Sequence, residues 1–231
     1  GLSHVSFGAL SIAVAAGWSP LKVSIPLVVL AAFFLLRITE HGKVKSDAAI
    51  AMISASSLAV GIIVTSLTTG MTTDVSSYMF GSILAMSRED VILSAVLSII
   101  VLCLFVFCYN KLFAVTFDEN FAKATGVNVE LYNVLIAVLT AVTIVLGMRM
   151  MGAMLISSLI IFPALTAMRI FKSFRGVVIC SGVLAVVCFL FGIIFSYGCS
   201  TPAGASVVLV NLAAFIVFSV VQSLLMRVTK K

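Results

Sequence analysis

The sequence predicts an all-α protein, a polytopic bundle of about eight helices that cross a membrane. Of its 231 residues, 62% are hydrophobic and only 10% are charged, and the mean hydropathy is +1.30. Several apolar runs reach the length of about 20 residues that a helix needs to cross the hydrocarbon core of a bilayer. These runs lack the alternation of barrel strands, and backbone groups in lipid must be hydrogen-bonded internally, so the spanning segments are predicted to be helices.

Hydropathy and turn residues divide the chain into eight candidate helices. A Gly17-Trp18-Ser19-Pro20 break separates the first pair, and a charged loop from Arg37 to Asp47 separates the next. The expected helices cover residues 1–17, 22–38, 47–69, 89–113, 130–148, 151–170, 175–198 and 204–228. Pro163 is expected to interrupt the sixth of them with a kink.

Two further expectations concern the domain organisation. Residues 78–87 are too few to span a membrane and too apolar for a free loop, so we expect a short helix at the outer interface. Residues 1–231 are expected to form a single transmembrane domain. Because the chain starts at Gly1 without a methionine, we also expect a truncated N-terminus.

The basic residues predict how the bundle is oriented. If the helices alternate in direction, three basic residues fall on one side and eleven on the other, and the richer side is expected to be cytoplasmic. The smaller set is Lys22, Arg88 and Arg149; the larger is Arg37, Lys43, Lys45, Lys111, Lys123, Arg169, Lys172, Arg175, Arg227, Lys230 and Lys231. The basic residues are scattered at helix ends, so the net charge of +6 does not predict a nucleic-acid partner.

A short polar segment, residues 117–127, lies between two long apolar runs. It reads Phe-Asp-Glu-Asn-Phe-Ala-Lys-Ala-Thr-Gly-Val and predicts one or two turns of amphipathic helix that end at Gly126. On the predicted orientation it faces the cytoplasm, where another protein could bind it. An ordinary connection between two helices is the alternative.

Two polar clusters remain within the apolar segments. His4 shares a helical stripe with Gly8 and Ser11, and a neutral imidazole is a good ligand for Zn²⁺, Mn²⁺ or Fe²⁺. A hydrogen bond between helices is the alternative role. The second cluster contains Ser200, Thr201, Pro202 and Gly204, residue types that also make a well-formed turn before a helix.

The sequence also lacks several catalytic patterns. It has no phosphate-binding loop, no zinc-protease motif and no nucleophile paired with a base, so no catalytic residue and no cofactor are predicted. The five cysteines show no metal-binding spacing, and we expect neither a disulfide nor a cysteine metal site. The centres of the predicted helices lack charged residues, which argues against an ion-coupled secondary carrier.

Four landmarks, in order, resemble the permease family of ATP-binding-cassette importers for zinc, manganese and iron. They are Leu2-Ser3-His4 with Phe7-Gly8; Phe80-Gly81-Ser82-Ile83-Leu84; the segment that ends at Gly126; and Gly152 to Ala167 followed by Thr201-Pro202-Ala203-Gly204. The resemblance spans nearly the whole chain. It departs from the family at two carboxylates: one would precede Gly1, and Ser200 replaces the other.

The resemblance implies a non-enzymatic transport subunit in a prokaryotic inner or plasma membrane, working by alternating access. Its implied partners are a cytoplasmic ATPase, an extracytoplasmic metal-binding protein, a second copy of itself and the surrounding lipid bilayer. His4 becomes the candidate metal ligand, and the ATPase-coupling candidates are Asp118, Glu119, Ala122 and Gly126. Candidates for lining or gating the path are Gly8, Pro163, Ser200, Thr201, Pro202 and Gly204.

Other functions stay open at this point. The sequence does not choose among zinc, manganese and iron, and a related permease could carry a metal chelate such as a siderophore. A secondary transporter or channel would work without an ATPase. A membrane-embedded enzyme or scaffold would need catalytic residues that the sequence does not show.

Overall fold

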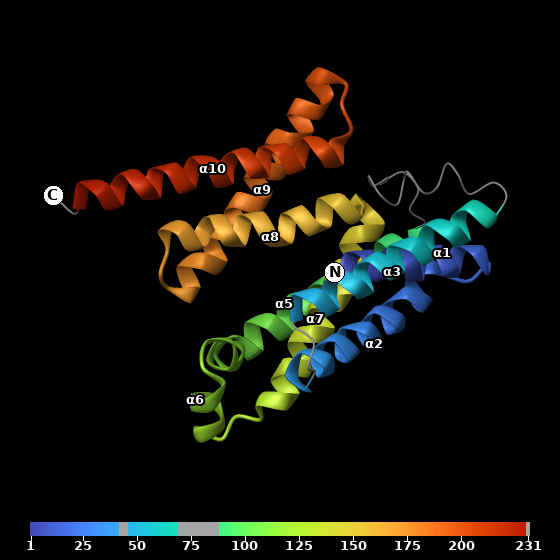
Figure 1. Cartoon of the computed structure of the whole chain (residues 1–231), viewed down its shortest axis with the longest axis horizontal. Helices are drawn as coiled ribbons and strands as arrows, with labels where there is room; N and C mark the ends of the chain where they lie inside the picture. The colour runs from blue at the N-terminus through green and yellow to red at the C-terminus, as the bar shows by residue number, and fades with distance from the viewer. Residues whose placement is uncertain (42–45, 69–87, 230–231) are drawn as a thin grey trace. The chain divides into compact units, whose positions relative to one another are not determined.

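The computed structural model describes residues 1–41, 46–68 and 88–229, and these residues form helices joined by short turns (Figure 1). The helices are α1 (Leu2–Ala15), α2 (Pro20–His41), α3 (Ser46–Leu67), α5 (Arg88–Phe117), α6 (Glu119–Ala124), α7 (Val129–Met151), α8 (Ala153–Ile170), α9 (Phe174–Cys199) and α10 (Ala203–Thr229). The all-helical prediction is confirmed, and the eight long helices lie within a few residues of their predicted bounds. The predicted helix at 78–87 lies outside the described residues.

Six of the described helices are long and apolar enough to cross a membrane, namely α3, α5, α7, α8, α9 and α10. The α1 helix and the apolar part of α2 are shorter. Pro26 and Pro163 lie inside helices, and the α8 helix continues through Pro163 to Ile170. All five cysteines lie among the described residues and are free.

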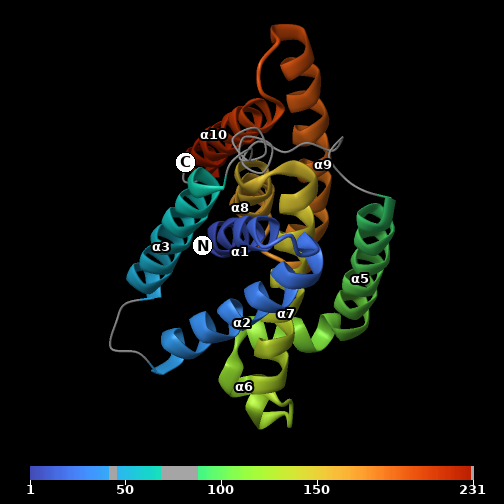
Figure 2. The same cartoon turned by 90° about the vertical axis from the view of Figure 1, so that its right-hand side faces the viewer.

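The chain divides into two compact units, residues 1–150 and 151–231. In unit 1, α1 lies between α2 and α3 and packs against both (Figure 2). Its core contains buried side chains from α1, α2 and α7. The α6 helix lies at the end of unit 1 where α2 finishes, and the turn between α1 and α2 lies at the opposite end (Figure 1).

Unit 2 consists of α8, α9 and α10, each of which packs against the other two. A close approach joins α9 to α10: a Cβ atom placed on Gly192 would lie 2.6 Å from the Cα of Val207. Two rings, those of Phe162 and Phe215, meet edge to face with centroids 6.3 Å apart and link α8 to α10. Small residues at such crossings let membrane helices approach closely, because the hydrophobic effect does not drive association within lipid.

Candidate functional site

Local capping contacts shape both ends of the connection between α5 and α7, here called the α6 loop (residues 118–128). The Asp118 carboxylate accepts a hydrogen bond from the backbone N–H of Phe121 at 3.0 Å and so caps the start of α6. At the other end Gly126 has a φ of +80°, a conformation that few residues other than glycine adopt. The Val127 N–H then donates to the Ala122 carbonyl at 3.0 Å and closes the helix end.

The α6 loop is also fixed to the two long helices beside it. Ala122 is 0% exposed and packs in a buried cluster with Val115 of α5 and Val129 of α7. The Asn133 side chain of α7 donates a hydrogen bond to Glu119 at 3.1 Å. The α6 loop is therefore bound to both α5 and α7.

These contacts give each of the four predicted coupling residues a place in building the loop. Asp118 caps α6, Glu119 binds α7, Ala122 fills the buried cluster and Gly126 supplies the left-handed turn. Asp118, Glu119 and Gly126 are also exposed, but the buried Ala122 has no free surface.

The surface that the α6 loop exposes is formed by other residues, which the sequence reasoning did not select. Phe121 is 61% exposed and Phe117, the last residue of α5, is 77% exposed. Asn120 and Lys123 lie beside them and are exposed as well. The cap pattern of Asp118 and Gly126 predicts where α6 begins and ends, but it does not show that Phe121 faces outward and Ala122 inward.

The second predicted site lies on α1, where Gly8 allows close contact with α3. A Cβ atom on Gly8 would lie 2.7 Å from the carbonyl oxygen of Ser57. Gly61 of α3 faces back, since its own added Cβ would lie 3.2 Å from the Cα of Gly8. The hydroxyl of Ser11, in the same stripe, donates to the Phe7 carbonyl at 2.9 Å and is satisfied within α1. Gly8 therefore has a packing role at this crossing.

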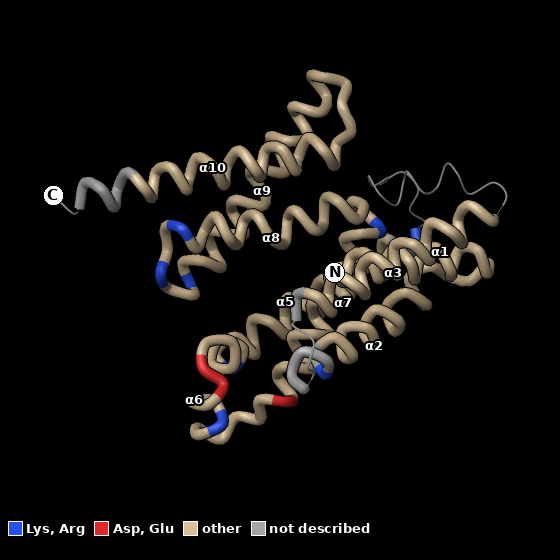
Figure 3. The backbone as a smooth tube through the Cα atoms, viewed as in Figure 1, with Lys and Arg blue, Asp and Glu red and all other residues tan. Residues whose placement is uncertain are grey.

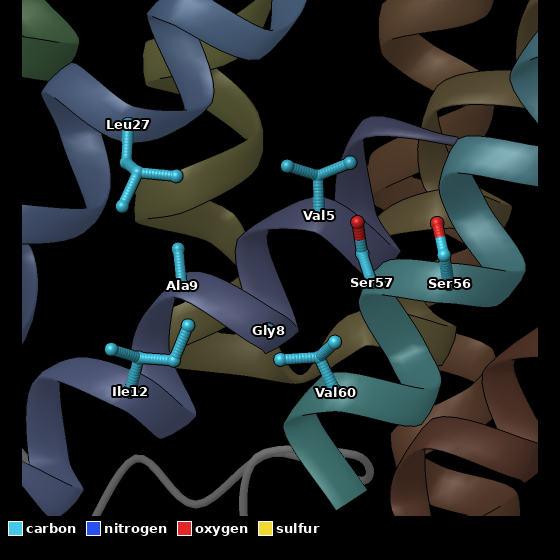
Figure 4. Close-up of a pocket in the computed structure, with 8 residues that line it drawn as sticks. All are labelled: Val5, Gly8, Ala9, Ile12, Leu27, Ser56, Ser57 and Val60. Carbon is cyan, nitrogen blue, oxygen red and sulfur yellow. The ribbon is translucent and has the colours of Figure 1, made fainter. Parts of the chain in front are cut away.

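A cavity of about 180 Å³ lies beside the crossing of α1 and α3 (Figure 4). Its lining residues are Val5, Gly8, Ala9 and Ile12 of α1, Leu27 of α2, and Ser56, Ser57 and Val60 of α3. None of them is charged, and the Ser56 hydroxyl donates to the Met52 carbonyl at 2.8 Å. The cavity is therefore mostly apolar and does not include His4.

His4 lies one helical turn before Gly8. Its Nδ1 atom is buried and has no hydrogen-bond partner. This atom therefore does not form the hydrogen bond between helices that was the alternative role of His4. Among the described residues, no group of three or more His, Cys, Asp or Glu side chains could hold a metal ion. In the described part of this chain, His4 thus has an unpartnered ring nitrogen but no companion ligands.

The third predicted cluster forms the turn between α9 and α10 in unit 2. Ser200 ends α9 in the left-handed conformation, with φ +53° and ψ +39°. The hydroxyls of Thr201 and Ser206 lie 2.7 Å apart, and that of Ser196 donates to the Thr201 carbonyl at 2.5 Å. These hydrogen bonds describe a well-formed turn before α10, in which Gly204 is buried.

A comparison with known families decides the class of this protein. The sequence profile of the ABC 3 transport family matches residues 1–222. The chain belongs to this family. As a member of the ABC 3 transport family it is a multi-pass permease subunit of the cell membrane and not an enzyme; a separate subunit hydrolyses ATP. The resemblance that the sequence motifs indicated is confirmed.

Individual relatives of this ABC 3 family member cover most of its length. The manganese import system permease protein ScaB of Streptococcus gordonii is 30% identical, covering 94% of this chain and 77% of its own. The zinc uptake membrane protein ZnuB of Haemophilus influenzae is 27% identical, covering 93% and 82%. A solved structure, PsaBC from Streptococcus pneumoniae in complex with Fab, has a TM-score of 0.82 at 29% identity, covering 94% of this chain and 78% of that one.

Proposed function

We propose that this permease imports a divalent transition-metal ion, zinc, manganese or iron, and that the α6 loop is where its cytoplasmic ATPase binds. The observation that carries the coupling assignment is the α6 loop itself, which contacts both α5 and α7 and exposes an aromatic face. The substrate class is supported by the relatives, whose names include zinc uptake and manganese import. A third relative, from Haemophilus influenzae, is named a probable iron transport system membrane protein.

The geometry of the α6 loop suits it to transmit force. Aromatic side chains are enriched at protein interfaces and often contribute much of the binding energy. Phe121 is such a side chain, and it is exposed beside Asn120 and Lys123. Ala122 and Glu119 tie the same short helix to α5 and α7. A movement of the ATPase at Phe121 would therefore be transmitted to both α5 and α7. Alternating access driven by ATP requires such a transmission.

The metal path is proposed to pass His4. Its unpartnered Nδ1 atom can bind a transition metal, and a single ligand lets the ion leave again. One imidazole does not complete a coordination sphere of four to six ligands. We therefore infer that a second copy of the permease contributes its own His4 and that an external metal-binding protein delivers the ion.

The coupling assignment is tested by replacing Phe121 with alanine in the complete transporter. Truncating a hot-spot residue of an interface to alanine costs about 2 kcal/mol or more of binding free energy. We therefore expect binding of the ATPase to weaken by about 30-fold or more. Phe107→Ala, at an exposed phenylalanine of α5 outside the α6 loop, is the matched control. Normal copurification of the ATPase and normal uptake with Phe121→Ala would refute the assignment.

The substrate assignment is tested by metal accumulation in cells that express the transporter. His4→Ala is expected to reduce uptake of the transported metal, measured for zinc, manganese and iron in parallel. Ser11→Ala is the matched control, because the Ser11 hydroxyl bonds only within α1. Equal accumulation of all three metals in His4→Ala and wild-type cells would remove His4 from the path.

A further inference from the structure

The net charge of the chain belongs entirely to unit 2. Residues 1–150 contain eight Lys or Arg and all eight Asp or Glu of the sequence, so they are formally neutral. Residues 151–231 contain six Lys or Arg and no acidic residue, which accounts for the whole +6. Figure 3 shows basic residues at the turn between α8 and α9 of this unit and no acidic ones.

Three of the six basic residues, Arg169, Lys172 and Arg175, lie within seven positions at this turn, and all three are exposed. The guanidinium of Arg169 lies over the ring of Phe215, with its carbon 5.3 Å from the ring centroid, which holds the charge near the end of α8. The other three, Arg227, Lys230 and Lys231, are among the last five residues of the chain. We call Arg169, Lys172 and Arg175 the basic turn.

Nothing inside unit 2 compensates these charges. Residues 151–231 contain no Asp or Glu side chain that could pair with them. Arg175 also lies in the first turn of α9, where the helix dipole is positive and disfavours a cation. The arrangement is electrostatically costly for unit 2 alone, so an anion from outside unit 2 would stabilise it.

The position of the basic turn favours a membrane surface as the source of that anion. It joins the ends of two candidate membrane spans, Ala153–Ile170 and Phe174–Cys199. Exposed apolar side chains, those of Met168, Ile170 and Phe171, alternate with the basic ones. At the end of a membrane span, a phospholipid offers a phosphate that can bind the cations and acyl chains that can contact the apolar side chains.

We propose that the basic turn of unit 2 binds the headgroups of anionic phospholipids in the cytoplasmic leaflet. Its three cations concentrate such lipids around the ends of α8 and α9, whereas unit 1, with equal numbers of acidic and basic residues, does not. Each basic residue near an anionic membrane contributes a factor of about five to the attraction. The bound lipid would supply the negative charge that residues 151–231 lack.

The test uses the complete transporter, purified in detergent and titrated with phosphatidylglycerol or phosphatidylcholine, with lipid binding followed by native mass spectrometry. Wild type is expected to retain phosphatidylglycerol preferentially. The triple variant Arg169→Gln, Lys172→Gln and Arg175→Gln is expected to weaken that binding by on the order of 100-fold. A control triple variant in unit 1, Lys22→Gln, Arg37→Gln and Lys111→Gln, removes the same charge and is expected to retain most of the binding.

Several results would overturn the proposal. Equal retention of the two lipids by wild type, or equal weakening by both triple variants, would show that no specific anionic-lipid surface exists at the basic turn. Loss of the ATPase from the first triple variant, with phosphatidylglycerol binding intact, would identify the turn as a protein-binding surface instead. If that variant fails to fold, Lys172→Gln alone is expected to weaken binding about fivefold, and no change would refute the proposal.

Discussion

Replacing Gly8 with alanine is expected to force α1 and α3 apart. The added Cβ would lie 2.7 Å from the carbonyl oxygen of Ser57 and 3.4 Å from its carbonyl carbon. A carbon and a carbonyl oxygen normally approach to about 3.3–3.6 Å, so one backbone must move by roughly 0.6 Å or more. Because the obstacle is a main-chain atom of α3, no rotamer change relieves the clash.

The size of the effect follows from two opposing contributions. Overpacking of this kind typically costs about 1–3 kcal/mol, whereas exchanging glycine for alanine within a helix gains up to about 1 kcal/mol. We therefore expect Gly8→Ala to lower the free energy of unfolding by about 1–2 kcal/mol. The assay is denaturant unfolding of the purified permease in detergent, accompanied by metal uptake in cells.

A matched control is available in α9. Gly182 is also helical, but an added Cβ would meet no atom within 4 Å, so Gly182→Ala has only the helix-propensity gain. It is expected to leave stability unchanged or slightly raised. Equal unfolding free energies for Gly8→Ala and Gly182→Ala would refute the reasoning that the crossing of α1 and α3 is limited by backbone contact.

Three further substitutions have expected outcomes. Gly192→Ala brings a Cβ to 2.6 Å from the Cα of Val207 and, after the same helix-propensity gain, should lower the unfolding free energy by about 1–2 kcal/mol. Asp118→Ala removes the cap of α6, about 1 kcal/mol, and should reduce copurification of the ATPase less than Phe121→Ala does; a larger reduction would contradict the proposed role of Phe121. Ser200→Gly removes the steric strain of a non-glycine residue in the left-handed conformation, so the unfolding free energy should rise by about 1 kcal/mol. A decrease in the unfolding free energy would contradict this account.

The long helices were predictable because lipid leaves few alternatives. A continuous apolar segment must form a helix to satisfy its backbone groups, and residues such as Gly17 and Pro20 mark the breaks between segments. The α5 helix runs to Phe117, four residues past its predicted end. Residues 114–117, Ala-Val-Thr-Phe, continue the apolar run after Lys111, and the helix ends where Asp118 caps the next one.

The contacts of the candidate sites were less predictable. The sequence selects the α6 loop, but one or two helical turns do not reveal which side packs inward, and the pairing of Ala122 with Val115 and Val129 needs three-dimensional contacts. The partner of Gly8 is Ser57, nearly 50 residues away in sequence, and nothing in either local sequence indicates the other. His4 was predictable as a ligand type, but the sequence does not show that its Nδ1 atom lacks a partner.

The division of the α6 loop into a buried side and an exposed side has an evolutionary consequence. The buried side, Ala122 with its neighbours, is constrained by packing within the bundle, whereas Asn120, Phe121 and Lys123 can change without disturbing it. Recognition of an ATPase could therefore diverge between paralogous transporters of one cell while the membrane architecture stays the same. Exchanging only these three side chains between two such permeases would then exchange their ATPases.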